Sequence, residues 1–124
     1  MKFKCIKTGE IMANCYILGC ETTGEAIIID PGFGFAKTLE QNYNLLNKLQ
    51  YFKELNVPIL VGLSRKSMLY NLLGIDVTEA LNATTAANML ALIGGASILR
   101  VHDVKEAKQA ISIFEKFRNC EKDK

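Results

Sequence analysis

The stretch Ala26-Ile27-Ile28-Ile29-Asp30-Pro31-Gly32 decides the fold, because a short apolar run ends there in a carboxylate and a Pro-Gly turn. A continuous apolar run bounded by turn residues indicates a strand that is buried on both faces. Two similar runs follow, at Ile59-Leu60-Val61 and at residues 97–101. Such strands are typical of a parallel sheet, so we predict that the three runs are strands of one parallel sheet.

Helical periodicity fills the sequence between these strands. The first helix is predicted to begin after Thr38, an N-cap whose capping box is completed by Gln41, and to extend to Phe52. Further helices are predicted at residues 67–73, at 80–93 with Thr78 as N-cap, and at 104–117. Because apolar strands that alternate with helices form right-handed βαβ units, residues 26–118 predict a parallel α/β fold.

The chain before this region has the pattern of antiparallel strands. β-rich runs at residues 2–8 and 14–18 are separated from each other and from residues 26–29 by short turns. Loops this short join antiparallel strands. The predicted fold class is therefore α/β, with a short antiparallel β-segment that continues into three parallel βα units.

Composition excludes several classes of protein. Of the 124 residues, 49% are hydrophobic and 23% are charged, as in a folded domain rather than a disordered chain. The net charge of +2, with no basic run longer than Arg65-Lys66, predicts no nucleic-acid partner. No apolar run is long enough for a signal core or a membrane span, so we expect no membrane partner and a cytoplasmic location. The four cysteines do not have the spacing of a zinc site, and we expect free thiols.

Polar residues gather where each predicted parallel strand ends. They are Asp30 after the first strand, Ser64-Arg65-Lys66 after the second, and Arg100, His102 and Asp103 after the third. In parallel α/β folds the ligand-binding groups lie at the carboxyl ends of the strands. We therefore predict a binding site at this edge of the sheet.

Three of these residues suit an anion and a flat heterocycle. Arg100 and His102 are two residues apart, so both point to the same side of a strand, where an arginine fork and a histidine donor suit a phosphate or pyrophosphate. A histidine held in the core by a backbone partner remains an alternative. The Asp30 carboxylate either accepts N–H donors from a heterocycle or begins the turn that follows it.

The other strand-end residues have ordinary structural explanations as well. Arg65 and Lys66 are either ligand contacts or solvated loop charges. Ser64 is no nucleophile unless a base lies beside it. Asp103 is placed to cap the last helix.

The strand-end motifs resemble those of the dihydropteroate synthase family. Residues 30–37, Asp-Pro-Gly-Phe-Gly-Phe-Ala-Lys, resemble its DPGxGFxK segment; Gly62-Leu63-Ser64-Arg65-Lys66-Ser67 resembles its SRK loop; and Arg100-Val101-His102-Asp103-Val104 resembles its RVHDV strand end. The motifs occur in the family's order over residues 27–118. The resemblance implies an enzyme, a transferase that condenses 6-hydroxymethyl-7,8-dihydropterin pyrophosphate with p-aminobenzoate in folate biosynthesis.

The resemblance also implies a role for each matching residue. Catalytic positions match Lys66, Arg100 and His102; pterin-binding positions match Asp30, Gly62 and Lys66; p-aminobenzoate-binding positions match Phe35 and Ser64; pyrophosphate-binding positions match Arg100 and His102. The family uses Mg²⁺, whose main protein ligand lies in a first-strand loop that this sequence does not contain, so no residue here is assigned to a metal. The implied partners are the two small-molecule substrates, and the resemblance is compatible with a homodimer.

The family's fold is a (βα)8 barrel, which takes about 250 residues. The resemblance therefore implies a partial TIM-type barrel made of the last three βα units, with weak activity or none in this chain alone. The implied domains are an antiparallel β-segment at residues 1–25, a half-barrel at 26–118 and a disordered tail at 119–124.

Residues 1–32 resemble a different family, the metallo-β-lactamase-fold hydrolases of the glyoxalase II type, chiefly at residues 14–18 and 25–32. The HxHxDH metal motif of those hydrolases is absent, since His102 is the only histidine. Both families share the string at residues 28–32, which suggests a chimera joined near Asp30. A hydrolase fragment and a non-catalytic α/β module that binds pterins or anions are the alternative functions.

Overall fold

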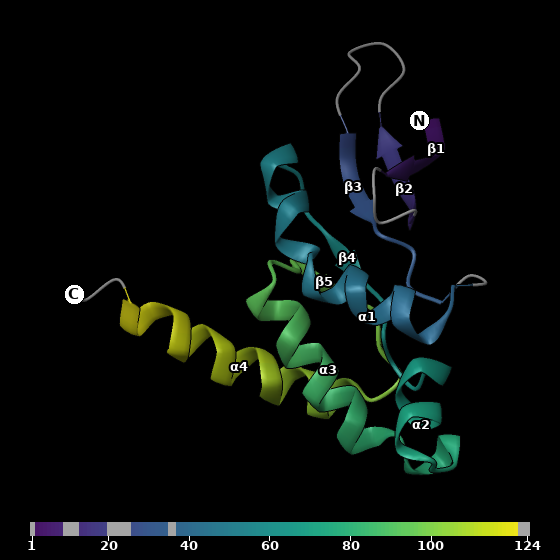
Figure 1. Ribbon diagram of the computed structural model, residues 1–124. Helices are drawn as coiled ribbons and strands as arrows, with labels where there is room; N and C mark the ends of the chain where they lie inside the picture. Colours follow the sequence, from purple (N-terminus) through teal and green to yellow (C-terminus); the bar gives the residue numbers. More distant parts are fainter. Residues whose placement is uncertain (1, 9–12, 20–25, 35–36, 122–124) are drawn as a thin grey trace.

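A computed structural model of the chain describes residues 2–8, 13–19, 26–34 and 37–121, with side chains for residues 28–34 and 37–120 (Figure 1). The strands are β1 (Lys2–Thr8), β2 (Ala13–Gly19), β3 (Ala26–Asp30), β4 (Leu60–Val61) and β5 (Ile98–Leu99). The helices are α1 (Leu39–Asn47), α2 (Ser67–Leu73), α3 (Leu81–Ile93) and α4 (Val104–Glu121), with 3-10 helices η2 (Leu49–Leu55) and η3 (Val77–Glu79).

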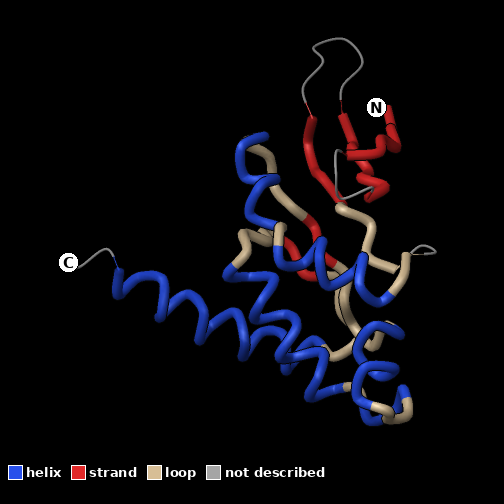
Figure 2. Tube along the Cα trace, viewed as in Figure 1, coloured by secondary structure: helices blue, strands red, loops and turns tan. Residues whose placement is uncertain are grey.

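The predicted antiparallel segment is confirmed. β1, β2 and β3 form one antiparallel sheet in that order. The ladder between β2 and β3 is irregular at Leu18 and Gly19. Figure 2 shows these strands together at one end of the molecule, with the helices at the other.

β3 connects this sheet to the parallel strands. Ile29 lies opposite Ile17 of β2, and on its other side it forms a parallel bridge with Ile59. The Ile29 amide donates a hydrogen bond to the Pro58 carbonyl at 3.0 Å. β4 then pairs with β5 in parallel. The parallel order β3-β4-β5 therefore agrees with the three predicted βα units.

The parallel strands are shorter than predicted, since the runs at residues 59–61 and 97–101 each contain a strand of two residues. Their backbone hydrogen bonds extend further than the strands do. The amides of Ser97 and Ile98 both donate to the Ile59 carbonyl, and the Arg100 amide donates to Val61. β5 pairs only with β4 among the described strands, and a strand paired on one side forms fewer ladder bonds.

The helix that follows β3 begins as predicted. Thr38 is the N-cap of α1, and its hydroxyl accepts the Gln41 amide at 3.1 Å while Gln41 Oε1 accepts the Thr38 amide at 2.9 Å. The predicted continuation of this helix to Phe52 is wrong. The α-helix ends at Asn47, and the chain continues as η2 until Asn56, whose φ of 52° lies in the left-handed region.

The predicted N-cap of the helix at residues 80–93 is also wrong. Asp76 caps η3 instead, because its carboxylate accepts both the amide of Thr78 at 2.9 Å and its hydroxyl at 2.8 Å. A carboxylate is a strong N-cap acceptor, and it occupies the Thr78 hydroxyl that was expected to cap. α3 then begins after Ala80 without a side-chain cap.

The disordered tail predicted at residues 119–124 is wrong for residues 119–121, which are the last residues of α4. The guanidinium of Arg118 lies 5.4 Å from the ring centroid of Phe114, one helical turn earlier. Such i,i+4 contacts stabilise a helix near its end. Residues 122–124 lie outside the described residues.

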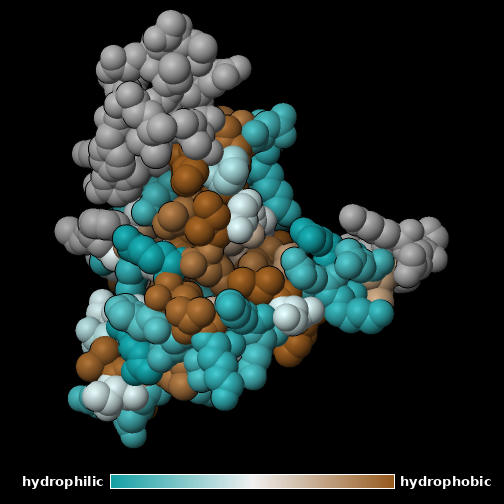
Figure 3. Space-filling view, turned by 180° about the vertical axis from the view of Figure 1, so that it is seen from behind, coloured by the Kyte–Doolittle hydropathy of each residue, from teal (hydrophilic) through white to brown (hydrophobic). Residues whose placement is uncertain are grey.

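The core lies between the parallel strands and helices α1, α2 and α3. Its most buried side chains come from each of these elements or from the loops beside them: Ile29, Phe33, Leu45, Leu49, Ile59, Val61, Leu63, Met68, Leu69 and Ala91. Figure 3 shows apolar side chains gathered across the middle of the rear face. None of the described helices has the length and hydropathy needed to cross a membrane.

Candidate functional site

A pocket of about 230 Å³ lies beside the carboxyl ends of β4 and β5. Its lining consists of Gly62, Ser64, Lys66, Arg100, Val101 and His102. Five of these six were predicted as site residues from the sequence. The pairing of β4 with β5 explains their meeting, because it places the segments that follow the two strands side by side.

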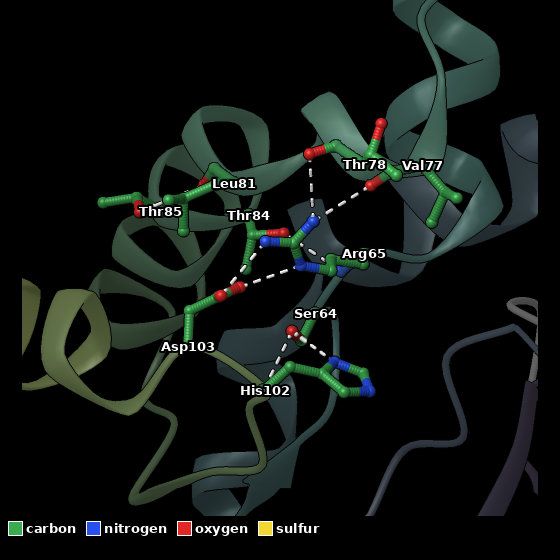
Figure 4. A network of polar contacts seen from close by, with 9 residues as sticks. All are labelled: Ser64, Arg65, Val77, Thr78, Leu81, Thr84, Thr85, His102 and Asp103. Atoms are coloured by element: carbon green, nitrogen blue, oxygen red, sulfur yellow. Dashed lines mark hydrogen bonds and ion pairs between the residues drawn. The ribbon is translucent and has the colours of Figure 1, made fainter.

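Within this pocket the side chains of Ser64 and His102 contact each other. The buried Ser64 Oγ lies 2.8 Å from His102 Nδ1 and accepts the His102 backbone amide at 3.1 Å (Figure 4). When the hydroxyl donates its hydrogen to Nδ1, the ring proton is on Nε2, which is then the donor left to a ligand. The sequence indicated no base beside Ser64, and the structure places one there.

Lys66 connects the pocket to the loop that follows β3. Its Nζ donates to the Phe33 carbonyl at 2.6 Å. Burial, as the main cause, and the positive charge of Arg100 together lower the pKa of Lys66 to about 8, while the negative charge of Asp30 acts in the opposite direction. Lys66 is therefore a loop cation held among other charges, and the solvated-charge alternative does not describe it.

Arg100 approaches the backbone of β4 closely. A Cβ on Gly62 would lie 2.8 Å from Arg100 Nη2 and 3.0 Å from its Nε. The side chain is exposed and lines the pocket. Glycine at position 62 therefore leaves the space in which the guanidinium lies, beside Lys66. Two cations held together repel, and an anion between them relieves that repulsion.

Two ligand residues predicted from the sequence, Asp30 and Phe35, belong to the end of β3 and to the loop that follows it. Asp30 Oδ1 accepts the Gly32 amide at 2.9 Å, which is the turn-forming arrangement. Phe35 lies outside the described residues. A residue that the sequence did not indicate also holds this loop, because the buried Asn42 of α1 accepts the Gly34 amide at 2.8 Å through its Oδ1.

Arg65 and Asp103 form a two-pronged ion pair outside the pocket lining. Arg65 Nε and Nη2 lie 3.0 Å from Asp103 Oδ2 and Oδ1, respectively. This hydrogen bonding raises the pKa of Arg65 and lowers the pKa of Asp103. Neither residue is the solvated charge or side-chain cap considered from sequence. The pair joins residues 38 apart, and no local pattern reveals such a contact.

The described residues do not offer a magnesium site of their own. They contain no group of three histidine, cysteine or acidic side chains close enough to hold a metal ion. Cys120 is a free, exposed thiol, as expected. The other cysteines lie among residues whose side chains are not described.

Sequence comparison matches residues 11–102 to the family described as "Pterin binding enzyme". The dihydropteroate synthase of Escherichia coli strain K12 is 46% identical over 102 residues, which are 80% of this chain and 36% of that protein. The dihydropteroate synthase of Synechocystis sp. is 48% identical over 90 residues, 72% of this chain and 31% of that protein. The chain thus spans about a third of the length of these relatives.

Solved structures give the same result. The 7,8-dihydropteroate synthase of Vibrio fischeri ES114 superposes with a TM-score of 0.73 at 40% identity, over 74% of this chain and 34% of that chain. A dihydropteroate synthase of Coxiella burnetii, solved in complex with pteroic acid, has a TM-score of 0.73 at 44% identity, over 76% and 35%. At these identities the similarity extends to the residues as well as to the fold.

Proposed function

The chain belongs to the family of pterin binding enzymes, and from this membership we propose that it carries the C-terminal part of a dihydropteroate synthase active site. The proposed reaction joins 6-hydroxymethyl-7,8-dihydropterin pyrophosphate to p-aminobenzoate. The amine nitrogen of p-aminobenzoate bonds to the pterin methylene carbon and loses a proton. The bond from that carbon to oxygen breaks, and pyrophosphate leaves with the electron pair.

The observation that carries this proposal is the meeting of Lys66, Arg100 and His102 in one pocket. A departing pyrophosphate gains negative charge, and preorganised cations and N–H donors at that point stabilise the transition state. An arginine fork suits phosphate oxygens in particular. At about 230 Å³ the pocket is smaller than a usual ligand site and suits the pyrophosphate end of the substrate.

The other residues receive the roles that the family resemblance implies. Asp30, Gly62 and Lys66 are proposed to bind the pterin, and Phe35 and Ser64 to lie beside p-aminobenzoate. Support comes from placement for three of these residues, since Gly62, Ser64 and Lys66 line the pocket. For Asp30, support comes from its electrostatic effect on Lys66.

The proposal includes a partial TIM-type barrel made of the last three βα units, in a cytoplasmic enzyme. The parallel order β3-β4-β5 and the superposition on dihydropteroate synthases support it. A barrel of this type needs further strands to surround its substrates. We therefore propose that this chain alone has weak activity or none, and that a homodimer or another chain supplies further walls.

The test is isothermal calorimetry of the chain with inorganic pyrophosphate and, separately, with a pterin. We expect Lys66→Ala and Arg100→Ala each to weaken pyrophosphate binding by about tenfold or more, the cost of losing one charged hydrogen-bonding group. Arg118→Ala is the matched control, because it removes a cation from the far part of α4. Heat from neither compound, or equal affinity in all four proteins, would contradict the proposal.

A second candidate is a non-catalytic module that binds anions or pterins. Its support is that the described pocket is lined by residues beside only two strands, β4 and β5. Chromatographic detection of dihydropteroate, formed from the two substrates by the purified chain, separates the candidates. Binding without product favours the module, and product favours the synthase.

The chimera hypothesis, with a hydrolase-like segment before Asp30, rests on sequence resemblance alone. The family match that begins at residue 11 weighs against a junction as late as residue 30. Sequencing of the source locus across codons 24–36 tests it: two separate intact genes there would exclude a natural fusion. A hydrolase fragment is tested by the zinc content of the purified chain.

A further inference from the structure

We propose that Arg65 is a positioning residue for the anion pocket: it holds the loop after β4 so that Ser64 meets His102 while its own side chain stays outside. This inference rests on the proposed function of the pocket as a pyrophosphate site. Arg65 does not line the pocket, although the residues on either side of it in the sequence, Ser64 and Lys66, both do. Its effect on a ligand must therefore act through other residues.

Two successive contacts join the loop after β4 to the loop after β5. Ser64 contacts His102, and Arg65 contacts Asp103, so each contact joins residues 38 apart (Figure 4). The first contact lies in the pocket and the second lies outside it. Because the two contacts share adjacent backbone positions on both loops, the outer ion pair fixes the register in which Ser64 meets His102.

The Arg65 side chain joins several segments of the chain. Besides the two oxygens of Asp103, its Nη1 donates to the carbonyls of Val77 at 3.1 Å and Thr78 at 3.2 Å. One guanidinium thus connects the loop after β4 to the start of α4 and to η3, as Figure 4 shows. Its planar donors satisfy acceptors in two directions at once, which a lysine ammonium on a flexible stem does less well.

The backbone conformation of Arg65 is also consistent with a residue that holds the loop in place. Its φ of 54° lies in the left-handed region, which is unfavourable for a residue with a side chain. The Arg65 amide donates to the hydroxyl of the buried Thr84 at 3.0 Å. A conformation of this kind persists when surrounding contacts hold it, and here the contacts on both the backbone and the side chain of Arg65 do so.

Charge alone does not explain a role for Arg65 in anion binding. Its positive charge is paired with the Asp103 carboxylate at 3.0 Å, so the pair contributes little net charge to the pocket. A variant that keeps the charge but not the planar fork therefore separates the two explanations. Arg65→Lys is that variant, and Arg118→Lys is its matched control on an exposed part of α4.

The experiment measures pyrophosphate affinity by calorimetry and the ¹⁵N shifts of the His102 ring by NMR. His102 is the only histidine, so its ring signals need no assignment. Ser64→Ala gives the shifts of a ring without the hydroxyl contact. We expect Arg65→Lys and Asp103→Asn to weaken pyrophosphate binding by about tenfold, as losses of supporting contacts around a site do, and to move the His102 shifts toward those of Ser64→Ala.

Arg65→Gly keeps the proposal testable if a lysine distorts the loop, because glycine adopts a φ of 54° without strain. It should show the same two changes, with circular dichroism reporting that the fold is retained. Wild-type affinity and wild-type His102 shifts in these variants would overturn the inference. If the unmodified chain binds no pyrophosphate, the proposed function fails, and the His102 shifts alone then decide whether Arg65 positions the loop.

Discussion

At the residue scale, the site depends on two cations, Lys66 and Arg100, that line the same pocket. The positive charge of Arg100 raises the free energy of the charged form of Lys66. Asp30 offsets part of this repulsion. The pocket is therefore prepared for an anion before one arrives, which is the arrangement that makes electrostatic stabilisation effective.

The pH dependence of anion binding should follow from Lys66. Its pKa of about 8 means that the ammonium is present below pH 8 and is lost as the pH rises through that value. Sulfate, which does not itself titrate in this range, should bind more weakly at pH 9 than at pH 7. The charged groups that act on the pKa of Lys66 are Arg100, Asp30 and Lys37.

The control for this prediction is Lys66→Arg, which keeps its charge up to the end of the range. Sulfate affinity of this variant, measured by NMR titration at both pH values, should change much less than that of the unmodified chain. Equal pH dependence in the two proteins would contradict the assignment of the step to Lys66.

Gly62→Ala should weaken anion binding and leave the fold intact. The three atoms nearest to the added Cβ all belong to the end of the Arg100 side chain, with Nη2 at 2.8 Å, and a flexible side chain moves away at little cost. We expect the midpoint of thermal unfolding to be unchanged and pyrophosphate affinity to fall by about three- to tenfold, the effect of a misplaced binding group. In an Arg100→Ala background the same substitution should have no further effect on calorimetric affinity. A similar loss in both backgrounds would show that the glycine acts by another route.

Most residues of the pocket were predictable from sequence, because they follow predicted parallel strands whose carboxyl ends lie at the same edge of the sheet. Ser64, Lys66, Arg100 and His102 needed only that parallel strands end together, whereas Gly62 was indicated by the family resemblance alone. The contacts between side chains were not predictable. The pairing of Arg65 with Asp103 depends on the relative height of two loops, which differs between parallel sheets and leaves no periodic signal.

At the element scale, the N-cap of a helix was predicted correctly where one candidate residue was present, and wrongly where two candidate residues lay close together. Thr38 had no competitor and formed its capping box. Thr78 was displaced by Asp76, which lies two residues earlier. The parallel strands were overestimated in length because apolar runs indicate burial, whereas a strand also requires a hydrogen-bonded neighbour on the correct side.

Thr38→Ala should destabilise the chain by about 1 kcal/mol, the usual loss for an N-cap hydroxyl. The substitution removes the acceptor of the Gln41 amide, and α1 packs its buried side chains against the core. Urea unfolding followed by circular dichroism measures the change. Thr85→Ala is the matched control, since its hydroxyl bonds to the Leu81 carbonyl inside α3 and caps nothing. Equal losses in the two variants would contradict a capping role.

At the scale of the whole molecule, a cavity of about 790 Å³ lies between β5, η2, the end of α3 and α4. Its lining combines polar and charged residues, such as Lys53 and Glu115, with apolar side chains that include Leu99 and Phe117, and Phe117 is 56% exposed. Exposed apolar surface beside a strand edge favours association with another chain. We therefore expect the purified chain to self-associate at high concentration.

Phe117→Lys should shift this association toward the monomer, as measured by size-exclusion chromatography with light scattering. Ser112→Lys adds the same charge to an exposed position of α4 outside the cavity and is the control. A monomeric unmodified chain, or an equal shift in both variants, would contradict the role of this cavity in association.

The shared position of Ile29 has a consequence for how the site can be observed. Its amide hydrogen is bonded to Pro58, across the boundary between the antiparallel sheet and the parallel strands. The rate of deuterium uptake at that one amide therefore reports how often the antiparallel sheet separates from the parallel strands. A ligand that contacts both the loop after β3 and the pocket beside β4 would hold the antiparallel sheet and the parallel strands together and would slow the deuterium uptake. Occupancy of the site could then be followed by NMR from the far side of the strand, with no substitution or label near the ligand.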